Sequence, residues 1–124
     1  MIKTITPIDN TIYVEREYNS KIIEETISNS VIAQNEWGLL KVEERVELLK
    51  KFVADFLSKE KQIIEEITRQ MGRPISQALN ELKGFKERAD YMLSIADEKL
   101  KNIYLPEKEN FKNYIKRIPM GVSF

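Results

Sequence analysis

Cysteine and histidine are both absent from the sequence. Their absence excludes disulfides, thiolate nucleophiles, a Ser-His or Cys-His pair and an ordinary zinc site within this chain. The chain also lacks a net charge, because 20 basic residues balance 20 acidic residues. A neutral chain without long charged blocks does not indicate nucleic acid or an anionic membrane as a partner. The sequence therefore predicts no catalytic residue and no cofactor-binding residue in this chain.

Long apolar runs are missing as well. No run approaches the length of a membrane span, and the N-terminal segment 1–7 lacks the apolar core of a signal peptide. We therefore expect a cytoplasmic protein. A chain of 124 residues fits one domain, and we treat residues 1–124 as a single segment.

The sequence does contain a long helical pattern between Ser76 and Ile103. Eight apolar residues follow one another there at steps of three or four, which places them on one side of an α-helix. They are Ala78, Leu82, Phe85, Ala89, Met92, Ala96, Leu100 and Ile103. The pattern predicts a helix roughly 40 Å long whose buried stripe organises the rest of the chain.

The remaining segments predict a mainly α fold with about four helices, an N-terminal β-hairpin and a C-terminal strand. The hairpin occupies 1–17, the helical region 18–104 and the strand 110–124. Expected elements are strands at 2–5 and 11–15, helices at 20–37, 42–58, 61–71 and 76–103, and a strand from 111 towards 124.

Several single residues carry local signals. Ser20 and Ser76 are expected helix N-caps, and Gly72 is expected to end a helix in the left-handed conformation. Gly84 lies inside the long helix, where glycine costs roughly 1 kcal/mol relative to alanine. Close packing of another backbone and approach of a ligand both explain such a glycine, and we favour packing.

Several motifs occur in an order that resembles a known family. They are Thr4-Ile5-Thr6-Pro7-Ile8-Asp9-Asn10 with Ile12-Tyr13-Val14; Ala33 and Trp37 ahead of Glu44-Arg45 and Leu48-Leu49; Met71-Gly72-Arg73-Pro74; Tyr91 and Ala96; and Arg117-Ile118-Pro119-Met120-Gly121-Val122. In this order and spacing the chain resembles the N-terminal portion of the NAD(P)-dependent aldehyde dehydrogenase superfamily.

The resemblance implies a chain roughly four times longer, with several domains. The hairpin and helices would flank the cofactor-binding sheet of an α/β fold, and segment 110–124 would lead towards the oligomerisation arm and that sheet. The partners implied are the remainder of the enzyme chain and further copies in a homo-oligomer. The full enzyme would oxidise an aldehyde to a carboxylic acid with NAD or NADP. Its catalytic cysteine, asparagine and glutamate would lie beyond Phe124, so no activity and no cofactor are expected for this chain alone.

The resemblance also implies two minor sites. Main-chain carbonyls of Thr4 and Ile5 with the side chain of Gln70 match the positions that bind a monovalent cation in some members, where an acidic residue replaces Gln70. Asn80 and Gly84, in the first half of the long helix, match positions that flank the substrate channel.

Two hypotheses remain open. The chain is either the N-terminal part of an aldehyde dehydrogenase or a stand-alone helical protein-interaction module. The apolar ending at Val122-Ser123-Phe124 favours the first, because it has the character of a buried strand.

Overall fold

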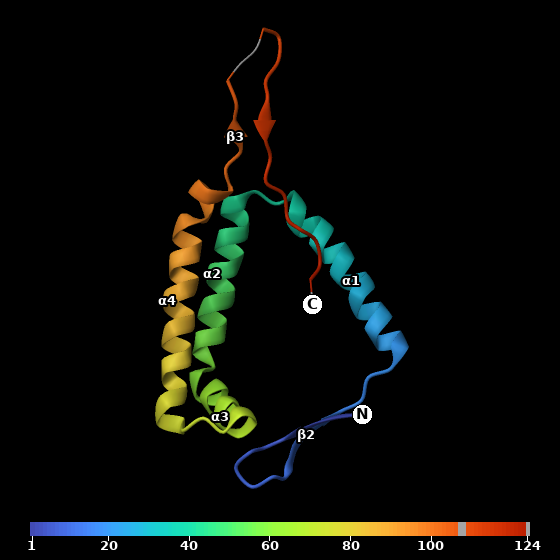
Figure 1. Ribbon diagram of the computed structural model, residues 1–124, viewed down its shortest axis with the longest axis vertical. Coiled ribbons are helices and arrows are strands. Elements are labelled where there is room, and N and C mark those ends of the chain that lie inside the picture. Colours follow the sequence, from blue (N-terminus) through green and yellow to red (C-terminus); the bar gives the residue numbers. More distant parts are fainter. Residues whose placement is uncertain (107–108, 124) are drawn as a thin grey trace.

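The computed structural model describes residues 1–106 and 109–123 (Figure 1). These residues form two antiparallel strand pairs and four helices, which confirms the predicted mainly helical fold with an N-terminal hairpin. The elements are β1 (Ile2–Ile5), β2 (Ile12–Arg16), α1 (Ser20–Leu39), α2 (Val42–Ser58), α3 (Glu60–Met71), α4 (Ile75–Leu100), β3 (Ile103–Tyr104) and β4 (Tyr114–Ile115). None of the helices described is long and apolar enough to cross a bilayer.

The N-terminal hairpin pairs β1 with β2, and its turn is fixed by side chains. The register shifts between Thr4 and Ile5, which marks an irregularity next to the turn. Asp9 accepts hydrogen bonds from the backbone N–H of Thr11 at 3.0 Å and from its hydroxyl at 2.7 Å. These bonds hold the pKa of Asp9 below its usual value. Asn10 takes the left-handed conformation, with φ of 60°, that asparagine tolerates in turns.

Two of the predicted helix caps are wrong by one or two residues. Asn19, rather than Ser20, caps α1, because its side chain accepts a hydrogen bond from the N–H of Ile22 at 2.9 Å. Helix α4 begins at Ile75, and Ser76 does not cap it. The carbonyl of Pro74 already accepts from the N–H groups of the first turn, so the helix starts before Ser76.

The predicted left-handed stop at Gly72 is confirmed. Its φ is 70°, and its N–H donates to the carbonyl of Thr68 at 2.9 Å. This closes the last turn of α3 in the conformation that glycine adopts at least cost. The chain can then turn through Pro74 into α4.

The core lies where α4 packs on α2 and α3 (Figure 1). Its buried apolar residues are Val53, Ala78 and Leu82, and the rings of Phe56 and Phe85 lie with centroids 4.8 Å apart. The predicted buried stripe is correct only for the first half of α4. Met92, Leu100 and Ile103 are 58%, 41% and 44% exposed. The reason is geometric: α3 lies beside the start of α4, as Figure 1 shows, and Ile103 has left the helix for β3.

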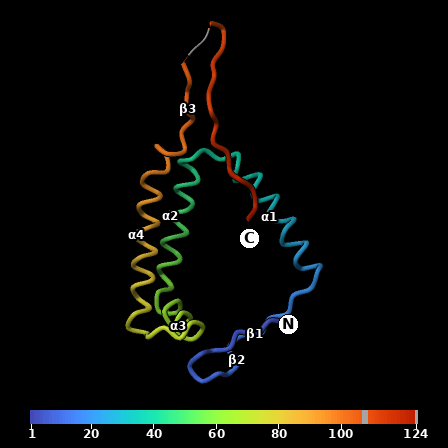
Figure 2. The backbone as a smooth tube through the Cα atoms, viewed as in Figure 1, coloured from blue at the N-terminus to red at the C-terminus, as the bar shows by residue number. Residues whose placement is uncertain are grey.

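Helix α1 stands apart from the other three helices (Figure 2). Its predicted stripe of Ile23, Ile27 and Val31 is exposed by 48%, 39% and 45%. Ile22 and Ile32, on other sides of the helix, are 46% and 60% exposed. A helix with apolar residues on several sides is normally buried. Among the described residues, no element covers α1 along its length.

The C-terminal strand is shorter than predicted. Strand β4 pairs with β3 antiparallel, the rings of Tyr104 and Tyr114 lie 5.7 Å apart, and the pair projects from the end of the helices (Figure 1). The segment after β4 is irregular, because Pro119 has no N–H to donate and Gly121 adopts φ of 113°. The predicted strand end at Phe124 lies outside the described residues.

Candidate functional site

The N-terminal hairpin meets the end of α3, which joins two of the sequence motifs in space. The hydroxyl of Tyr13 on β2 donates to Glu66 Oε1 at 3.1 Å, and the Arg69 guanidinium lies 5.7 Å from the centre of the Tyr13 ring. A Cβ atom placed on Gly72 would lie 2.7 Å from Cγ of Pro7. The hairpin is therefore held against α3 by one hydrogen bond, one cation–π contact and close packing.

The pKa of Tyr13 is raised above its usual value. Desolvation is the main cause, and the hydrogen bond to Glu66 adds to it, because the carboxylate disfavours a second negative charge. Since the folded-state pKa is the higher one, this stabilisation is present below the unfolded pKa of tyrosine. It is lost as the pH rises through the folded-state value.

The predicted cation ligands lie on the hairpin and on α3, the two elements that meet here. Thr4 and Ile5 end β1, and Gln70 lies in the last turn of α3. The Gln70 amide nitrogen donates to Glu66 Oε2 at 2.6 Å, so Glu66 has a donor on each oxygen. Only the neutral amide oxygen of Gln70 remains for a cation, a weaker ligand than the carboxylate of the family pattern. The cation site stays a prediction.

Replacing Gly72 with alanine should loosen the hairpin. The new Cβ atom would clash with Pro7, and alanine at position 72 would have to adopt a left-handed φ. Together these effects should destabilise the fold by about 1–3 kcal/mol. Thermal unfolding followed by circular dichroism measures the loss. The double variant Gly72→Ala with Pro7→Ala is the control, because removing the proline ring should recover part of it. Equal melting of the wild type and Gly72→Ala would contradict the packing.

A second candidate site is a hollow on the side of α4. Its volume is about 440 Å³, and it is lined by Glu81, Gly84, Phe85, Arg88, Ala89 and Met92. The prediction that Gly84 serves close packing is wrong for the described residues, because no atom lies within 4 Å of a Cβ atom placed there. Asn80 is exposed and does not line the hollow, although it lies one helical turn before Gly84 on the same side of α4. The substrate-channel assignment of Asn80 and Gly84 stays a prediction.

The end of α1, the start of α2, the end of α4 and segment 116–119 meet at a junction around a second hollow of about 660 Å³. Arg117 Nη1 donates to the carbonyl of Lys99 at 2.6 Å. The Arg45 guanidinium lies 6.0 Å from the centre of the Trp37 ring. Pro119 lies beside Gly38. Motif residues more than 70 positions apart therefore converge at this junction.

None of these three places contains the parts of a reaction centre within the described residues. The sequence has no cysteine or histidine, and the described residues hold no group of three acidic side chains placed to bind a metal. Both described sheets are antiparallel pairs. A dinucleotide is normally held at a glycine-rich turn between a parallel strand and a helix, so the described residues do not fit that cofactor.

The comparisons with known proteins decide the family. The model of the aldehyde dehydrogenase family matches residues 1–124. The chain belongs to this family. No curated protein matches the sequence.

Two solved structures of aldehyde dehydrogenases share the fold. An NAD-dependent benzaldehyde dehydrogenase from Corynebacterium glutamicum has a TM-score of 0.73 and 18% identity over 86% of this chain and 23% of its own. A succinic semialdehyde dehydrogenase from Streptococcus pyogenes, in complex with NADP+, has a TM-score of 0.75 and 22% identity over 90% of this chain and 25% of its own. The chain thus spans about a quarter of the length of these aldehyde dehydrogenases.

Sequence reasoning missed the contact between Tyr13 and Glu66. The two residues are 53 positions apart, and neither belongs to a local pattern that points to the other. It also missed Arg88 and the hollow around it. The available signal was Gly84, since a glycine inside a helix indicates either close packing of another backbone or the approach of a ligand.

Proposed function

We propose that this chain forms the N-terminal part of an NAD(P)-dependent aldehyde dehydrogenase, in which the complete enzyme oxidises an aldehyde to a carboxylic acid. The observation that carries the proposal is the match of the family model to every residue from 1 to 124. The role of this part is structural: it flanks the domain that binds NAD or NADP. That cofactor accepts hydride from the substrate when it is bound to the enzyme.

The exposure of α1 supports this role. Apolar residues on several sides of the helix need partners, and the described residues supply none along its length. The solved relatives are about four times longer than the part this chain matches, so further chain is a natural source of those partners. A stand-alone interaction module would be expected to cover such a helix itself.

Three further features belong to the proposal. The complete enzyme is a homo-oligomer, the strand pair β3–β4 lies in or near its oligomerisation arm, and the enzyme acts in the cytoplasm. The projection of β3–β4 from the helices supports a place in or near the oligomerisation arm, because bare strand edges pair readily with other chains (Figure 1). We also propose that the main-chain carbonyls of Thr4 and Ile5 and the side chain of Gln70 bind a monovalent cation.

The 124-residue chain alone should oxidise no aldehyde and should bind NAD weakly or not at all. It has no cysteine to attack the carbonyl carbon of the aldehyde. Nicotinamide absorbance, followed with purified chain, NAD or NADP and several small aldehydes, measures the activity. Turnover that disappears when a residue of this chain is mutated would contradict the expectation.

The DNA after the codon for Phe124 tests the proposed function directly. We expect the reading frame to continue into a Pro-Trp-Asn motif and, later, a Gly-Gln-x-Cys motif, which would supply the missing asparagine and cysteine. A stop codon directly after Phe124 would favour the interaction module instead.

A further inference from the structure

Basic side chains gather at the junction of α1, α2, α4 and segment 116–119. The hollow at this junction, about 660 Å³ in volume, is lined by four cationic residues and one acidic residue, Glu43. The cationic residues are Lys41, Arg45, Lys116 and Arg117. The chain as a whole has no net charge, so this excess of positive charge is local. It arises because the fold brings the C-terminal segment to the start of α2.

The four cationic side chains have no acidic partner in the part of the chain that the structure describes. The ion pairs found there join other residues. Glu44, the next acid along α2, accepts a hydrogen bond from the backbone N–H of Lys41 at 2.7 Å. The Nε atom of Arg45 is buried and has no hydrogen-bond acceptor among the described residues. Since buried donors are normally hydrogen-bonded, Arg45 indicates an acceptor that these residues do not supply.

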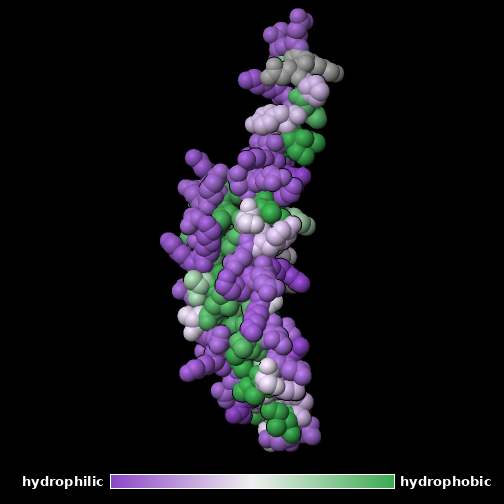
Figure 3. Space-filling view, turned by 90° about the vertical axis from the view of Figure 1, so that its left-hand side faces the viewer, coloured by the Kyte–Doolittle hydropathy of each residue, from purple (hydrophilic) through white to green (hydrophobic). Residues whose placement is uncertain are grey.

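The backbone at the start of α2 adds to the positive field of the hollow. The first N–H groups of a helix have no acceptor within it, and the helix dipole places partial positive charge at this end. Phosphate groups bind readily at such a position. Gln34 and Asn102 also line the hollow and supply amide donors. Figure 3 shows that the α4 side of the molecule is mostly hydrophilic where the strand pair leaves the helices.

A phosphate group fits this arrangement better than a carboxylate does. Phosphate carries a charge of about −1.5 to −2 and three strong acceptor oxygens, which point in different directions. A carboxylate carries one charge, and its two oxygens accept in one plane. The donors at the hollow come from four segments of the chain and so approach from several sides. The guanidinium groups of Arg45 and Arg117 can each form paired hydrogen bonds to phosphate oxygens.

We propose that the junction hollow binds a small ligand that carries a phosphate group. Arg45 and Arg117 pair with the phosphate oxygens, and Lys41 and Lys116 supply further positive charge. Arg117 keeps its contact with the end of α4 through Nη1 and offers its remaining N–H groups to the ligand. The ligand ties segment 116–119 to the start of α2, so its binding stabilises the folded protein. This site takes no part in aldehyde oxidation and goes beyond the proposed function.

The test uses the complete polypeptide, with any chain that follows Phe124, and measures ligand binding by isothermal titration calorimetry. Pyrophosphate should bind in a saturable manner and should raise the melting temperature. Succinate, a dianion without phosphate, should bind roughly 10-fold more weakly or worse. Phenyl phosphate separates two sources of the phosphate group. Tighter binding of phenyl phosphate would identify an organic phosphate ester as the ligand, and tighter binding of pyrophosphate would identify a free polyphosphate ion.

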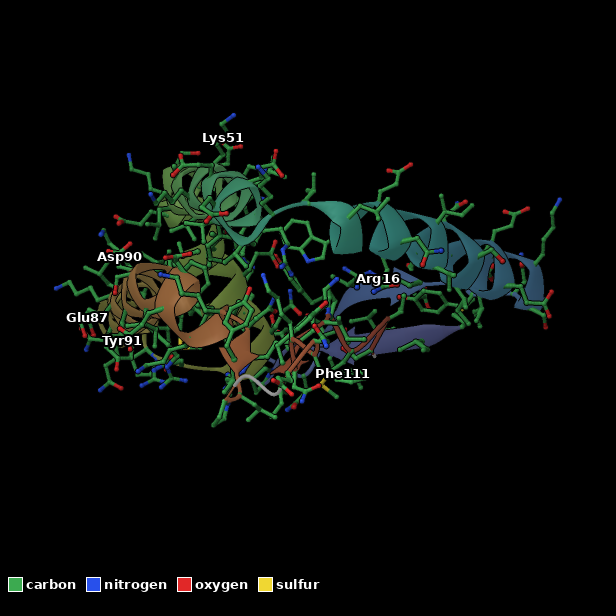
Figure 4. All side chains as sticks on the ribbon, turned by 90° about the horizontal axis from the view of Figure 1, so that it is seen from above. Arg16, Lys51, Glu87, Asp90, Tyr91 and Phe111 are labelled. Atoms are coloured by element: carbon green, nitrogen blue, oxygen red, sulfur yellow. The ribbon has the colours of Figure 1, made fainter. Side chains whose placement is uncertain are left out.

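Two variants locate the bound phosphate. In Arg45→Gln the Kd of pyrophosphate should rise by roughly 10-fold to 100-fold, because a hydrogen bond from a charged donor is lost. Lys41→Gln with Lys116→Gln changes only exposed side chains, so it tests the site even if Arg45→Gln impairs folding, and it should raise the Kd by roughly 3-fold to 10-fold. Lys51→Gln with Lys61→Gln is the matched control and should leave the Kd unchanged. These two exposed lysines do not line the hollow, and Figure 4 shows Lys51 pointing outward from α2.

Three results would overturn the inference. The first is a wild type that shows no saturable binding of either phosphate compound. The second is equal affinity for succinate and pyrophosphate, which would mean a basic surface without selectivity for phosphate. The third is a Kd that is the same in the wild type and in both hollow variants, which would place the phosphate elsewhere on the protein. No aldehyde is present in these measurements, so a failure of the proposed function would leave their outcome unchanged.

Discussion

Replacing Leu82 with aspartate should abolish the folded arrangement of α2, α3 and α4. Leu82 is 3% exposed, and the only other buried apolar residues described are Val53 and Ala78. A carboxylate buried there without a partner costs several kcal/mol, which is comparable to the total stability of a small domain. Circular dichroism during heating should show a reduced helical signal and no cooperative transition.

The control for this variant is Leu39→Asp. Leu39 ends α1 and is 87% exposed, so the same change of residue type should have little effect there. Leu82→Ala should lie between the two, with a loss of about 2–5 kcal/mol for a truncated core leucine. If Leu82→Asp melted like the wild type, the contact of α4 with α2 and α3 would not be the core of this chain.

Lysines on the apolar side of α1 should convert an associating chain into a monomer. Ile23 and Ile27 are 48% and 39% exposed, and exposed apolar surface of this kind favours association. The wild-type chain should therefore self-associate and bind an apolar dye. Ile23→Lys with Ile27→Lys should reduce both, as measured by light scattering after size exclusion and by dye fluorescence.

Two control variants separate the possible causes of association. Ser28→Lys with Asn29→Lys adds the same charge to exposed polar positions of α1 and should leave the mass unchanged. Val122→Lys with Phe124→Lys places the charge at the C-terminus and tests whether the terminal segment is responsible; Phe124 lies outside the described residues. A sharp wild-type monomer with no dye binding would count against the chain being part of a larger fold.

The sequence predicts local structure well where a repeating pattern determines it. Helix α2 has its predicted bounds, Val42–Ser58, because its apolar spacing is regular and α3 follows at once. The cap of α1 was misplaced by one residue, because Asn19 and Ser20 are both good capping residues and only the side-chain geometry distinguishes them.

Burial and long-range contacts are less accessible from the sequence. Met92 continues the stripe of α4, yet it is exposed, because α3 lies beside the start of α4 (Figure 1). The apolar periodicity predicts which side of α4 is buried, but not how far along α4 its packing partners extend. The contact of Tyr13 with Glu66 and the open space at Gly84 depend on how the elements are placed in space, which no local pattern contains.

The separation of α1 from the other helices has a consequence during protein synthesis. Helices α2, α3 and α4 follow one another in the chain, and α4 packs on both α2 and α3. Contacts between segments so close in the sequence form quickly. Helix α1 leaves the ribosome before them, yet its apolar sides find no partner in the described residues. In a longer chain the isoleucines of α1 would stay exposed to water until later segments had been synthesised. It is therefore the part of the nascent chain on which we expect chaperones to act first.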